Sequence, residues 1–336
     1  MSLTTRRPTG KPAWPILLIA GGEKAGKTYS AAEASASPLV GRTLWVSIGE
    51  DEPDEYGAIP GTDFEIVAHD GTYRGILATL RAASAEPVTD QPNLLVLDST
   101  TRLWDLLCDM AQAEANRRAR IKAEKYHRPV PDDDVTIGMD LWNTAKQRWA
   151  HVLDVLRDHD GPSILTARLE QTVVVDSKGD PTKDKVWKVK AEKGLPFDAG
   201  VIVEMPTFGE VYLTGVRSLR FKPEPGARTA MKDFTVDDLW RRLGLADEDG
   251  TSPRQHTSND AQGEQREIAA APRRDELLIE VAAACEAVGF TRADIAQRWL
   301  EEHSEPIQTT TNLAGLEELL AGLAKAQRPD ENGAVV

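Results

Sequence analysis

The chain has 336 residues, of which 40 are Lys or Arg and 54 are Asp or Glu, so its formal net charge is −14. This length allows one large α/β domain and a small appendage. No apolar stretch reaches the roughly 20 residues that a membrane-spanning helix needs, and the N-terminus lacks a signal-peptide core. The two cysteines, Cys108 and Cys285, lie far apart, which argues against a disulfide framework or a zinc site and indicates a cytoplasmic protein.

The negative charge is concentrated near the C-terminus. From Leu245 onward, 8 Lys or Arg residues oppose 18 Asp or Glu residues, a balance of −10, which leaves −4 for residues 1–244. The larger part of the chain can therefore present a basic face to nucleic acid, even though the chain as a whole is acidic.

The first predicted strand and helix enclose a glycine-rich loop. Residues 1–13 have no apolar period and are predicted to be a flexible arm. The apolar run 16–20 is typical of a buried strand, and the Ala- and Ser-rich run 29–36 is typical of a helix packed on a sheet. Between them lies a match to the phosphate-binding pattern G-x-x-x-x-G-K-[ST], namely Gly21-Gly22-Glu23-Lys24-Ala25-Gly26-Lys27-Thr28.

This order of strand, loop and helix points backbone N–H groups and a helix N-terminus at a polyphosphate. We expect residues 21–29, Tyr29 included, to bind ATP, with Lys27 as a catalytic residue beside the terminal phosphates and Thr28 as a Mg²⁺ ligand. The alternative is an ordinary glycine-rich turn, which the flanking strand and helix disfavour.

The second predicted strand, 43–48, ends just before an acidic run. Hydrolysis of ATP needs a group that orients the attacking water near the γ-phosphate. We expect Glu50 to be this catalytic residue, because strand ends beside the phosphate loop open on the same edge of the sheet. Asp51 and Glu52 are rival candidates, and the whole run could also be a solvated loop.

A second nucleotide-binding motif follows the predicted strand at 64–67. Residues 93–98 form an apolar run that ends in Asp98, and in P-loop NTPases such a carboxylate binds Mg²⁺ through a water molecule. Any buried parallel strand can end in Asp, so the run is a weak signal by itself. Because it follows a phosphate-binding loop, we predict that Asp98 belongs to the metal site together with Thr28.

Two stretches interleave cations with aromatic residues. The first, a predicted insertion after Asp98, contains Arg117, Arg118, Arg120, Lys122, Lys125, Tyr126, His127 and Arg128. The second, a predicted β-hairpin within 171–190, contains Lys178, Lys183, Lys185, Trp187 and Lys188. This mixture suits single-stranded DNA, because cations neutralise phosphates while bases stack on rings. A charged helix face is the alternative for the first stretch, and the Asp132-Asp133-Asp134 run offsets part of its charge.

An apolar stripe before the fifth predicted strand, 163–167, predicts a helix packed on the sheet; it comprises Met139, Trp142, Trp149, Val152, Leu153 and Leu156.

Thr166 and Arg168 end the fifth predicted strand, where a γ-phosphate-sensing side chain belongs. Arg168 is a catalytic candidate that stabilises transition-state charge, or else an ordinary ion-pair partner. Lys190 and Lys193 are candidates for reaching the nucleotide of a neighbouring subunit, or else solvated strand-end residues.

Short predicted strands at 199–204 and 210–214 complete a mostly parallel sheet followed by β-hairpins. This pattern predicts an α/β, RecA-like P-loop NTPase domain over 14–244. Residues 245–272 are acidic and polar and are predicted to be a linker. Helical periods within 273–328, with Thr291 and Asn312 as N-caps, predict a three-helix module, and 329–336 are predicted to be a flexible tail.

The order of these motifs resembles that of the phage-encoded RecA-like ATPases of the Sak single-strand annealing group, which are trimmed relatives of bacterial RecA. The resemblance covers residues 12–244 and rests on the loop at 21–28, Asp98-Ser99-Thr100, the Trp142 helix, the 164–168 strand and the 193–199 segment.

The resemblance implies ATP and Mg²⁺ as cofactors, single-stranded DNA as a partner, and assembly into a homo-oligomeric ring or filament. It also implies a role in phage recombination, in the host cytoplasm, alongside a single-strand binding or annealing protein. The family roles transfer to Lys27, Thr28, Asp98 and Glu50. The chain has Thr166-Ala167-Arg168 where the RecA-style sensor has an Asn-Gln pair, which favours annealing over strand exchange.

The sequence therefore predicts an ATPase that acts on single-stranded DNA in recombination or replication. A helicase-like or helicase-loading ATPase on the same core is one alternative, and a nucleotide-gated interaction protein is another. A small-molecule kinase fits less well, because no Arg-rich lid segment follows the core.

Overall fold

The computed structural model describes residues 3, 5–175, 181–221, 228–247, 250–254, 274, 277–285, 287–303, 306–308, 310 and 312–326. The chain divides into two compact units, residues 1–256 and 257–336. Residues 177–180 of the predicted hairpin tip at 177–181, most of the predicted linker and the predicted tail lie outside the described residues. Within the described ranges, no helix combines the length and the apolar character needed to cross a bilayer.

A single sheet organises the first unit. Its spatial order is β3-β2-β4-β5-β1-β7-β8-β9, and β6 pairs with the outer part of β5. The strands from β3 to β7 in this order are parallel, whereas β6, β8 and β9 are antiparallel to their neighbours. Their bounds are β1 Ile16–Gly21, β2 Thr43–Ser47, β3 Glu65–Ile66, β4 Leu94–Asp98, β5 Ser163–Val175, β6 Pro181–Lys190, β7 Val201–Met205, β8 Tyr212–Val216 and β9 Thr229–Ala230. The predicted mostly parallel α/β sheet is confirmed.

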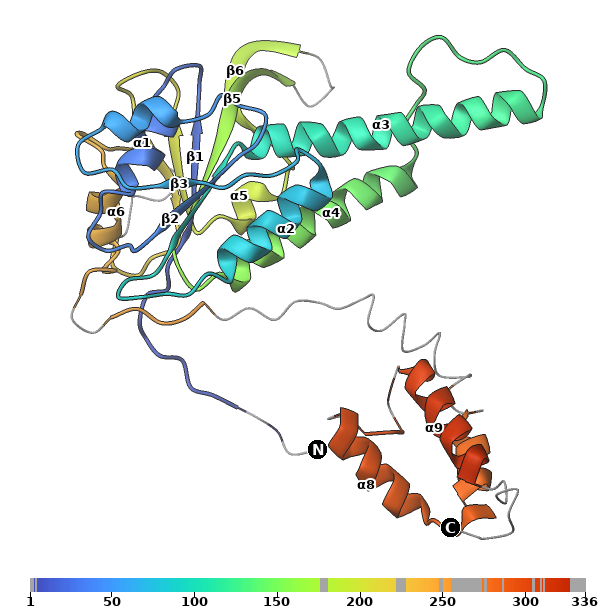
Figure 1. Ribbon diagram of the computed structural model, residues 1–336. Coiled ribbons are helices and arrows are strands. Elements are labelled where there is room, and N and C mark those ends of the chain that lie inside the picture. The colour runs from blue at the N-terminus through green and yellow to red at the C-terminus, as the bar shows by residue number, and fades with distance from the viewer. Residues whose placement is uncertain are drawn as a thin grey trace. The chain divides into compact units, whose positions relative to one another are not determined.

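Helices cover both faces of the sheet (Figure 1). The helices α1 (Lys27–Ala34) and α6 (Val236–Arg242) cover one face, and α2 (Tyr73–Ser84), α3 (Thr100–Lys125) and α4 (Met139–Asp158) cover the other. Strand β1 is buried throughout and contributes alternate residues to the two hydrophobic clusters, as a central strand must. A 3₁₀ turn, η1 (Asp54–Ala58), follows β2, and the short helix α5 (Leu195–Asp198) precedes β7.

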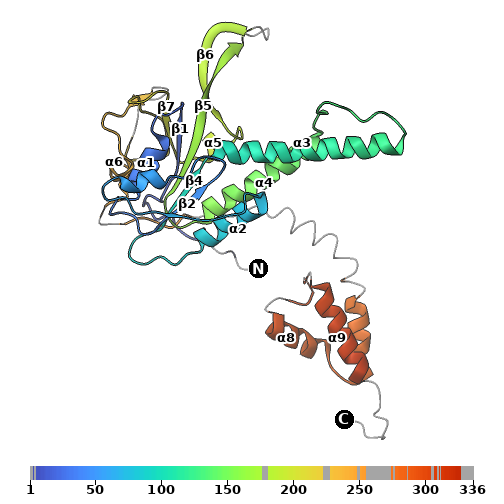
Figure 2. The same ribbon diagram turned by 45° about the horizontal axis from the view of Figure 1, so that its top comes forward.

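Two elements project from the body of this unit, the β5–β6 hairpin and the outer part of α3 (Figures 1 and 2). The sequence predicts two strands, at 163–167 and 171–176, but the structure has one continuous strand, β5. No proline or glycine interrupts residues 163–175, and the β-branched residues near its end favour extended backbone. The predicted insertion after Asp98 is a continuation of α3 in its first part.

The predicted stripe on α4 is wrong at Met139, and Trp142 is only half-buried. Met139 is 72% exposed, because it is the first residue of α4 and lies beyond the part of the helix that packs on the sheet. Trp149, Val152, Leu153 and Leu156 are buried against the sheet as predicted.

The second unit contains helical residues 277–285 and the helices α8 (Arg292–His303) and α9 (Leu313–Ala326). Its core includes Leu277, Trp299 and Leu316. Thr291 and Asn312 accept capping hydrogen bonds at the starts of α8 and α9, from the amides of residues 294 and 315 at 3.2 and 3.0 Å. Both predicted N-caps are therefore confirmed.

Candidate functional site

The glycine loop joins β1 to α1 in a tight curve. Gly26 has φ 101°, in the left-handed region that favours glycine. The Gly22 amide donates to Met205 O at 2.9 Å, and a Cβ built on Gly22 would lie 2.4 Å from Pro206 O. Only glycine fits this approach to the end of β7. The loop is therefore held against the sheet edge by close backbone contact.

The helix N-terminus that follows the loop is open to an anion. Gly26 is its N-cap; among the described residues no side chain caps α1, and none in its first turn is acidic. The first amides of α1 therefore point outward with the positive end of the helix dipole. Lys27 Nζ donates to Gly22 O at 2.7 Å, so the ammonium already lies over the loop. Burial lowers the pKa of Lys27, while the nearby charges of Asp98 and Glu50 oppose that shift.

Asp98 lies at the carboxyl end of β4, where its side chain is buried. Its Oδ2 accepts from Thr28 Oγ1 at 3.1 Å, and its Oδ1 accepts from Thr166 Oγ1. Burial raises the pKa of Asp98, and the two hydroxyl hydrogen bonds and Lys27 oppose the rise only partly. A buried carboxylate with mainly neutral partners is a favourable place for a divalent cation.

The donor set fits Mg²⁺, which prefers oxygen ligands and is commonly held by one or two protein side chains plus phosphates and waters. Thr28 and Asp98 provide such a hydroxyl and carboxylate beside the phosphate loop. Across the described part of the chain, no group of three or more His, Cys, Asp and Glu residues is placed to hold a metal by itself. A cation here would therefore depend on phosphate oxygens to complete its shell.

Glu50 and Arg168, which the sequence singles out separately, form an ion pair. Arg168 Nη2 donates to both carboxylate oxygens of Glu50 at 2.8 Å, and Ser99 Oγ donates to Glu50 Oε1 at 2.8 Å. Burial alone raises the pKa of Glu50, but the hydrogen bonds from Arg168 and Ser99 outweigh it and lower the pKa. Glu50 thus lies in the site, whereas its rivals Asp51 and Glu52 are exposed.

Sequence reasoning missed the hydroxyl residues that open α3. Ser99 is the N-cap of α3 and also contacts Glu50. Thr101 Oγ1 donates to Lys190 O at 2.6 Å and accepts from the Arg168 amide at 2.9 Å. The available signal was the run of hydroxyl residues directly after Asp98, which is typical of a helix start.

Two lysines were candidates for reaching the nucleotide of a neighbouring subunit. Lys190 Nζ lies 3.7 Å from Asp105 Oδ2, and Lys193 is exposed.

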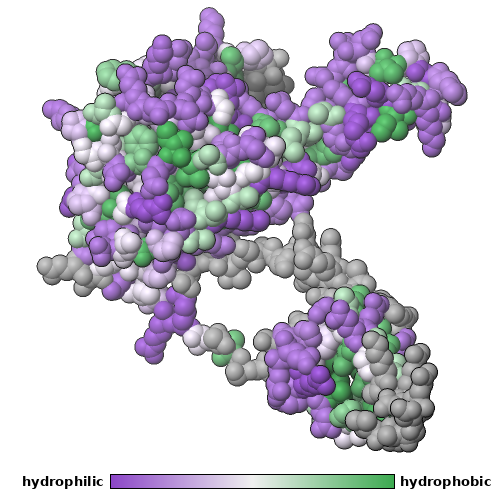
Figure 3. Space-filling view, viewed as in Figure 1, coloured by the Kyte–Doolittle hydropathy of each residue, from purple (hydrophilic) through white to green (hydrophobic). Residues whose placement is uncertain are grey.

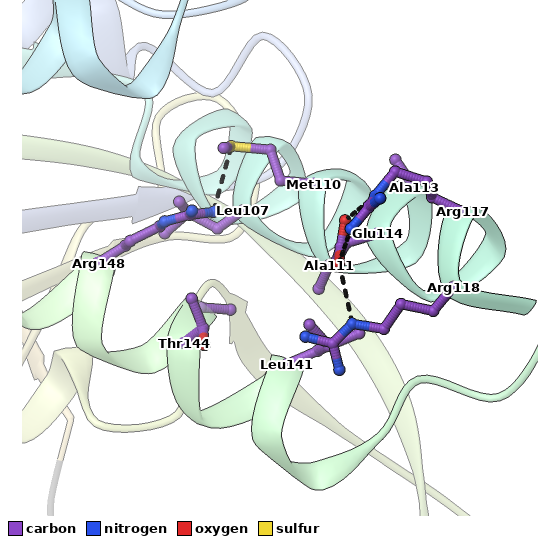
Figure 4. Close-up of a pocket in the computed structure, with 11 residues that line it drawn as sticks. Leu107, Met110, Ala111, Ala113, Glu114, Arg117, Arg118, Leu141, Thr144 and Arg148 are labelled. Atoms are coloured by element: carbon purple, nitrogen blue, oxygen red, sulfur yellow. Dashed lines mark hydrogen bonds and ion pairs between the residues drawn. The ribbon is translucent and has the colours of Figure 1, made fainter. Parts of the chain in front are cut away.

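A groove between α3 and α4 lies apart from the nucleotide site (Figure 4). It has a volume of about 500 Å³, a floor of small and apolar residues, and cations along its rim. Arg117 and Arg118 both bind Glu114, while Arg148 lies 5.5 Å from the ring centre of Tyr73. A second hollow of about 310 Å³ continues along α3 and is lined by Arg118, Ile121, Lys122, Lys125 and Tyr126. Figure 3 shows that the projecting end of α3 is largely hydrophilic, with isolated hydrophobic residues.

The hairpin offers fewer aromatic contacts than predicted. Lys183, Lys185 and Lys188 are exposed, and Lys178 lies outside the described residues. Trp187 is half-buried and packs against the core at the base of the hairpin. The arm formed by the outer part of α3 keeps an exposed aromatic residue, Tyr126.

The strand order, the glycine loop and the position of Asp98 define an α/β fold with a mostly parallel sheet and a P-loop at the end of β1. No protein-family model and no curated protein matches the chain. A solved RadB recombinase is 16% identical over 66% of this chain and 89% of its own, with a TM-score of 0.37. A prototypical ATPase from the type III secretion system of pathogenic bacteria is 12% identical over 94% and 80%, with a TM-score of 0.35. A DnaB-like replicative helicase is 12% identical over 64% and 55%, with a TM-score of 0.34.

The raised pKa of Asp98 yields a stability prediction. The folded protein favours the protonated carboxyl, so its contribution to stability is complete below the unfolded-state pKa and is lost as pH rises through the higher folded-state pKa. Asp98→Asn is therefore expected to raise the melting temperature of the nucleotide-free protein at pH 7.5, because asparagine carries no buried charge. Each kcal/mol gained in the free energy of unfolding corresponds to about 2–4 °C. Lowering the pH should shrink this difference. Thermal unfolding without Mg²⁺ measures it.

Asp90→Asn, an exposed change in the loop before β4, provides the matched control and should leave the melting temperature unaltered. A melting temperature for Asp98→Asn below that of the parent at pH 7.5 would show that Asp98 is not an electrostatic cost to the nucleotide-free fold.

Proposed function

We propose that this protein is a Mg²⁺-dependent ATPase that acts on single-stranded DNA in phage recombination, annealing or replication, as a member of the Sak group. The convergence of Lys27, Thr28 and Asp98 around the open N-terminus of α1 carries the proposal. These residues supply the cation, the hydroxyl and the carboxylate that an Mg²⁺-bound triphosphate requires.

Each residue has a distinct role in this reaction. The loop amides and Lys27 bind the phosphates, and Thr28 and Asp98 hold Mg²⁺, which neutralises phosphate charge when bound. Glu50 orients the attacking water and accepts its proton. The water oxygen then bonds to the γ-phosphorus while the bond to the bridging oxygen breaks, releasing ADP and phosphate. Arg168 stabilises the charge that builds up on the transferred group.

The grooves along α3 support single-stranded DNA as the partner. Arg117, Lys122 and Lys125 place positive charge along one projecting helix, and Tyr126 adds an exposed ring beside them. Cations that follow a phosphate backbone and rings that stack on bases are the usual elements of a single-strand groove. The exposed lysines of β6 extend this basic character to the hairpin.

An exposed apolar residue near the phosphate loop, Phe208, supports assembly into a ring or filament. Phe208 is 84% exposed in the turn that follows Pro206, the residue against which Gly22 packs. A neighbouring copy that covers Phe208 would also approach the nucleotide, and Lys190 or Lys193 of that copy would then act in trans.

The helical second unit is proposed to bind a single-strand binding or annealing protein.

The most direct test of the function is ATP hydrolysis measured with and without single-stranded DNA over a salt series. We expect DNA to stimulate hydrolysis at low salt and the stimulation to fade as salt rises, because phosphate contacts release counterions. If DNA does not stimulate hydrolysis at any salt concentration, the ATPase assignment still holds, but single-stranded DNA is not the partner. Unwinding of a forked duplex would favour the helicase alternative.

Charge reversal on α3 tests the proposed DNA surface. The double variant Lys122→Glu, Lys125→Glu is expected to reduce the slope of log affinity against log salt by about 2, because two phosphate contacts are lost. Fluorescence anisotropy with an oligonucleotide measures this slope. The matched control is Arg217→Glu, Lys232→Glu, which makes the same charge change at two exposed positions flanking β8 and β9. Equal losses in the two double variants would mean that net charge alone governs binding.

A further inference from the structure

The carboxylate of Glu50 is almost fully occupied by donors from its own chain. Oε1 accepts from Ser99 Oγ at 2.8 Å and from Arg168 Nε and Nη2 at 3.2 and 2.8 Å, and Oε2 accepts from the same Nη2 at 2.8 Å. A carboxylate oxygen offers about two lone pairs. A water molecule that needs Glu50 as its acceptor therefore competes with Arg168 and Ser99 for the same positions.

A triphosphate bound at the glycine loop would present Arg168 with a second anion. It pairs in register with Gly21, the first residue of the phosphate loop, across the parallel strands β5 and β1. Its positive charge already acts on Lys27, the ammonium that meets the terminal phosphates. A guanidinium fork binds carboxylate and phosphate equally well in bidentate geometry.

Only the side chain of Arg168 needs to move between these two anions. Its amide donates to Thr101 Oγ1 at 2.9 Å, and its backbone pairs with Lys190 in the β5–β6 ladder. The side chain is 39% exposed, and that of Glu50 is 27% exposed, so no buried packing has to be broken for the pair to separate.

We propose that Arg168 withholds Glu50 from water in the nucleotide-free protein and releases it by moving to the γ-phosphate. The inference rests on the proposed ATPase function. With ADP, which lacks the γ-phosphate, Arg168 stays on Glu50 and the site remains inactive. With ATP, transfer of the guanidinium to the phosphate frees Oε2 of Glu50 for the attacking water, while Ser99 Oγ still donates to Oε1. The Glu50–Arg168 pair therefore distinguishes ATP from ADP.

The experiment measures affinity for a non-hydrolysable ATP analogue and for ADP, both with Mg²⁺, in the parent and three variants. Glu50→Gln weakens the hold on Arg168 and is expected to tighten binding of the analogue about tenfold, within the usual range of coupling between sites. Affinity for ADP should stay within about twofold of the parent, because ADP lacks the γ-phosphate that couples Arg168 to the nucleotide. Arg168→Gln should weaken binding of the analogue and leave ADP unaffected.

The double variant Glu50→Gln, Arg168→Gln completes the cycle and should bind the analogue like Arg168→Gln alone, because Glu50 acts on the phosphate only through Arg168. Glu55→Gln, an exposed change in η1, is the matched control and should behave like the parent. A Glu50→Gln variant that gains affinity for both nucleotides equally, or for neither, would overturn the inference. A parent protein that binds neither nucleotide would instead overturn the proposed function.

Discussion

The register of the parallel strands is the constraint on which the proposed nucleotide site depends. Strand β1 pairs with β5 so that Gly21 is beside Arg168, and β2 pairs with β4 so that Ser47 is beside Asp98. The loop glycines, the carboxylate of Asp98 and the Glu50–Arg168 pair therefore meet at one edge of the sheet. A slip of one residue would turn each side chain to the opposite face, so the packing of both faces fixes the site as well as the core.

The phosphate loop and Asp98 were predictable because their signals are local. A strand, a glycine pattern and a helix fix the loop within one short segment, and an apolar strand ending in a carboxylate identifies Asp98. Both motifs lie beside one another in the structure, and Thr28 and Asp98 are in hydrogen-bond contact. In such cases the backbone conformation follows directly from the residue types.

The pairing of Glu50 with Arg168 was not predictable, although each residue was singled out separately. They are 118 positions apart, and their contact depends on the positions of β2 and β5 in the sheet, which no sequence period reveals. The same reason explains why Thr101, which ties Lys190 to Arg168, was missed. The packing of Trp187 on the core was likewise not predictable, because no local sequence signal shows that the base of the hairpin lies against the core.

Helix α3 joins the two halves of the proposed function. Its N-cap, Ser99, binds Glu50 in the nucleotide site, and its outer turns carry the cations that line the grooves. The central claim is that a triphosphate is bound at the junction of β1 and α1, with Lys27 as its principal cation. Titration of ATP and Mg²⁺ into Lys27→Ala tests this most directly. We predict a loss of affinity of about 10- to 200-fold, as expected when a charged hydrogen bond to phosphate is removed; unchanged affinity would contradict the account.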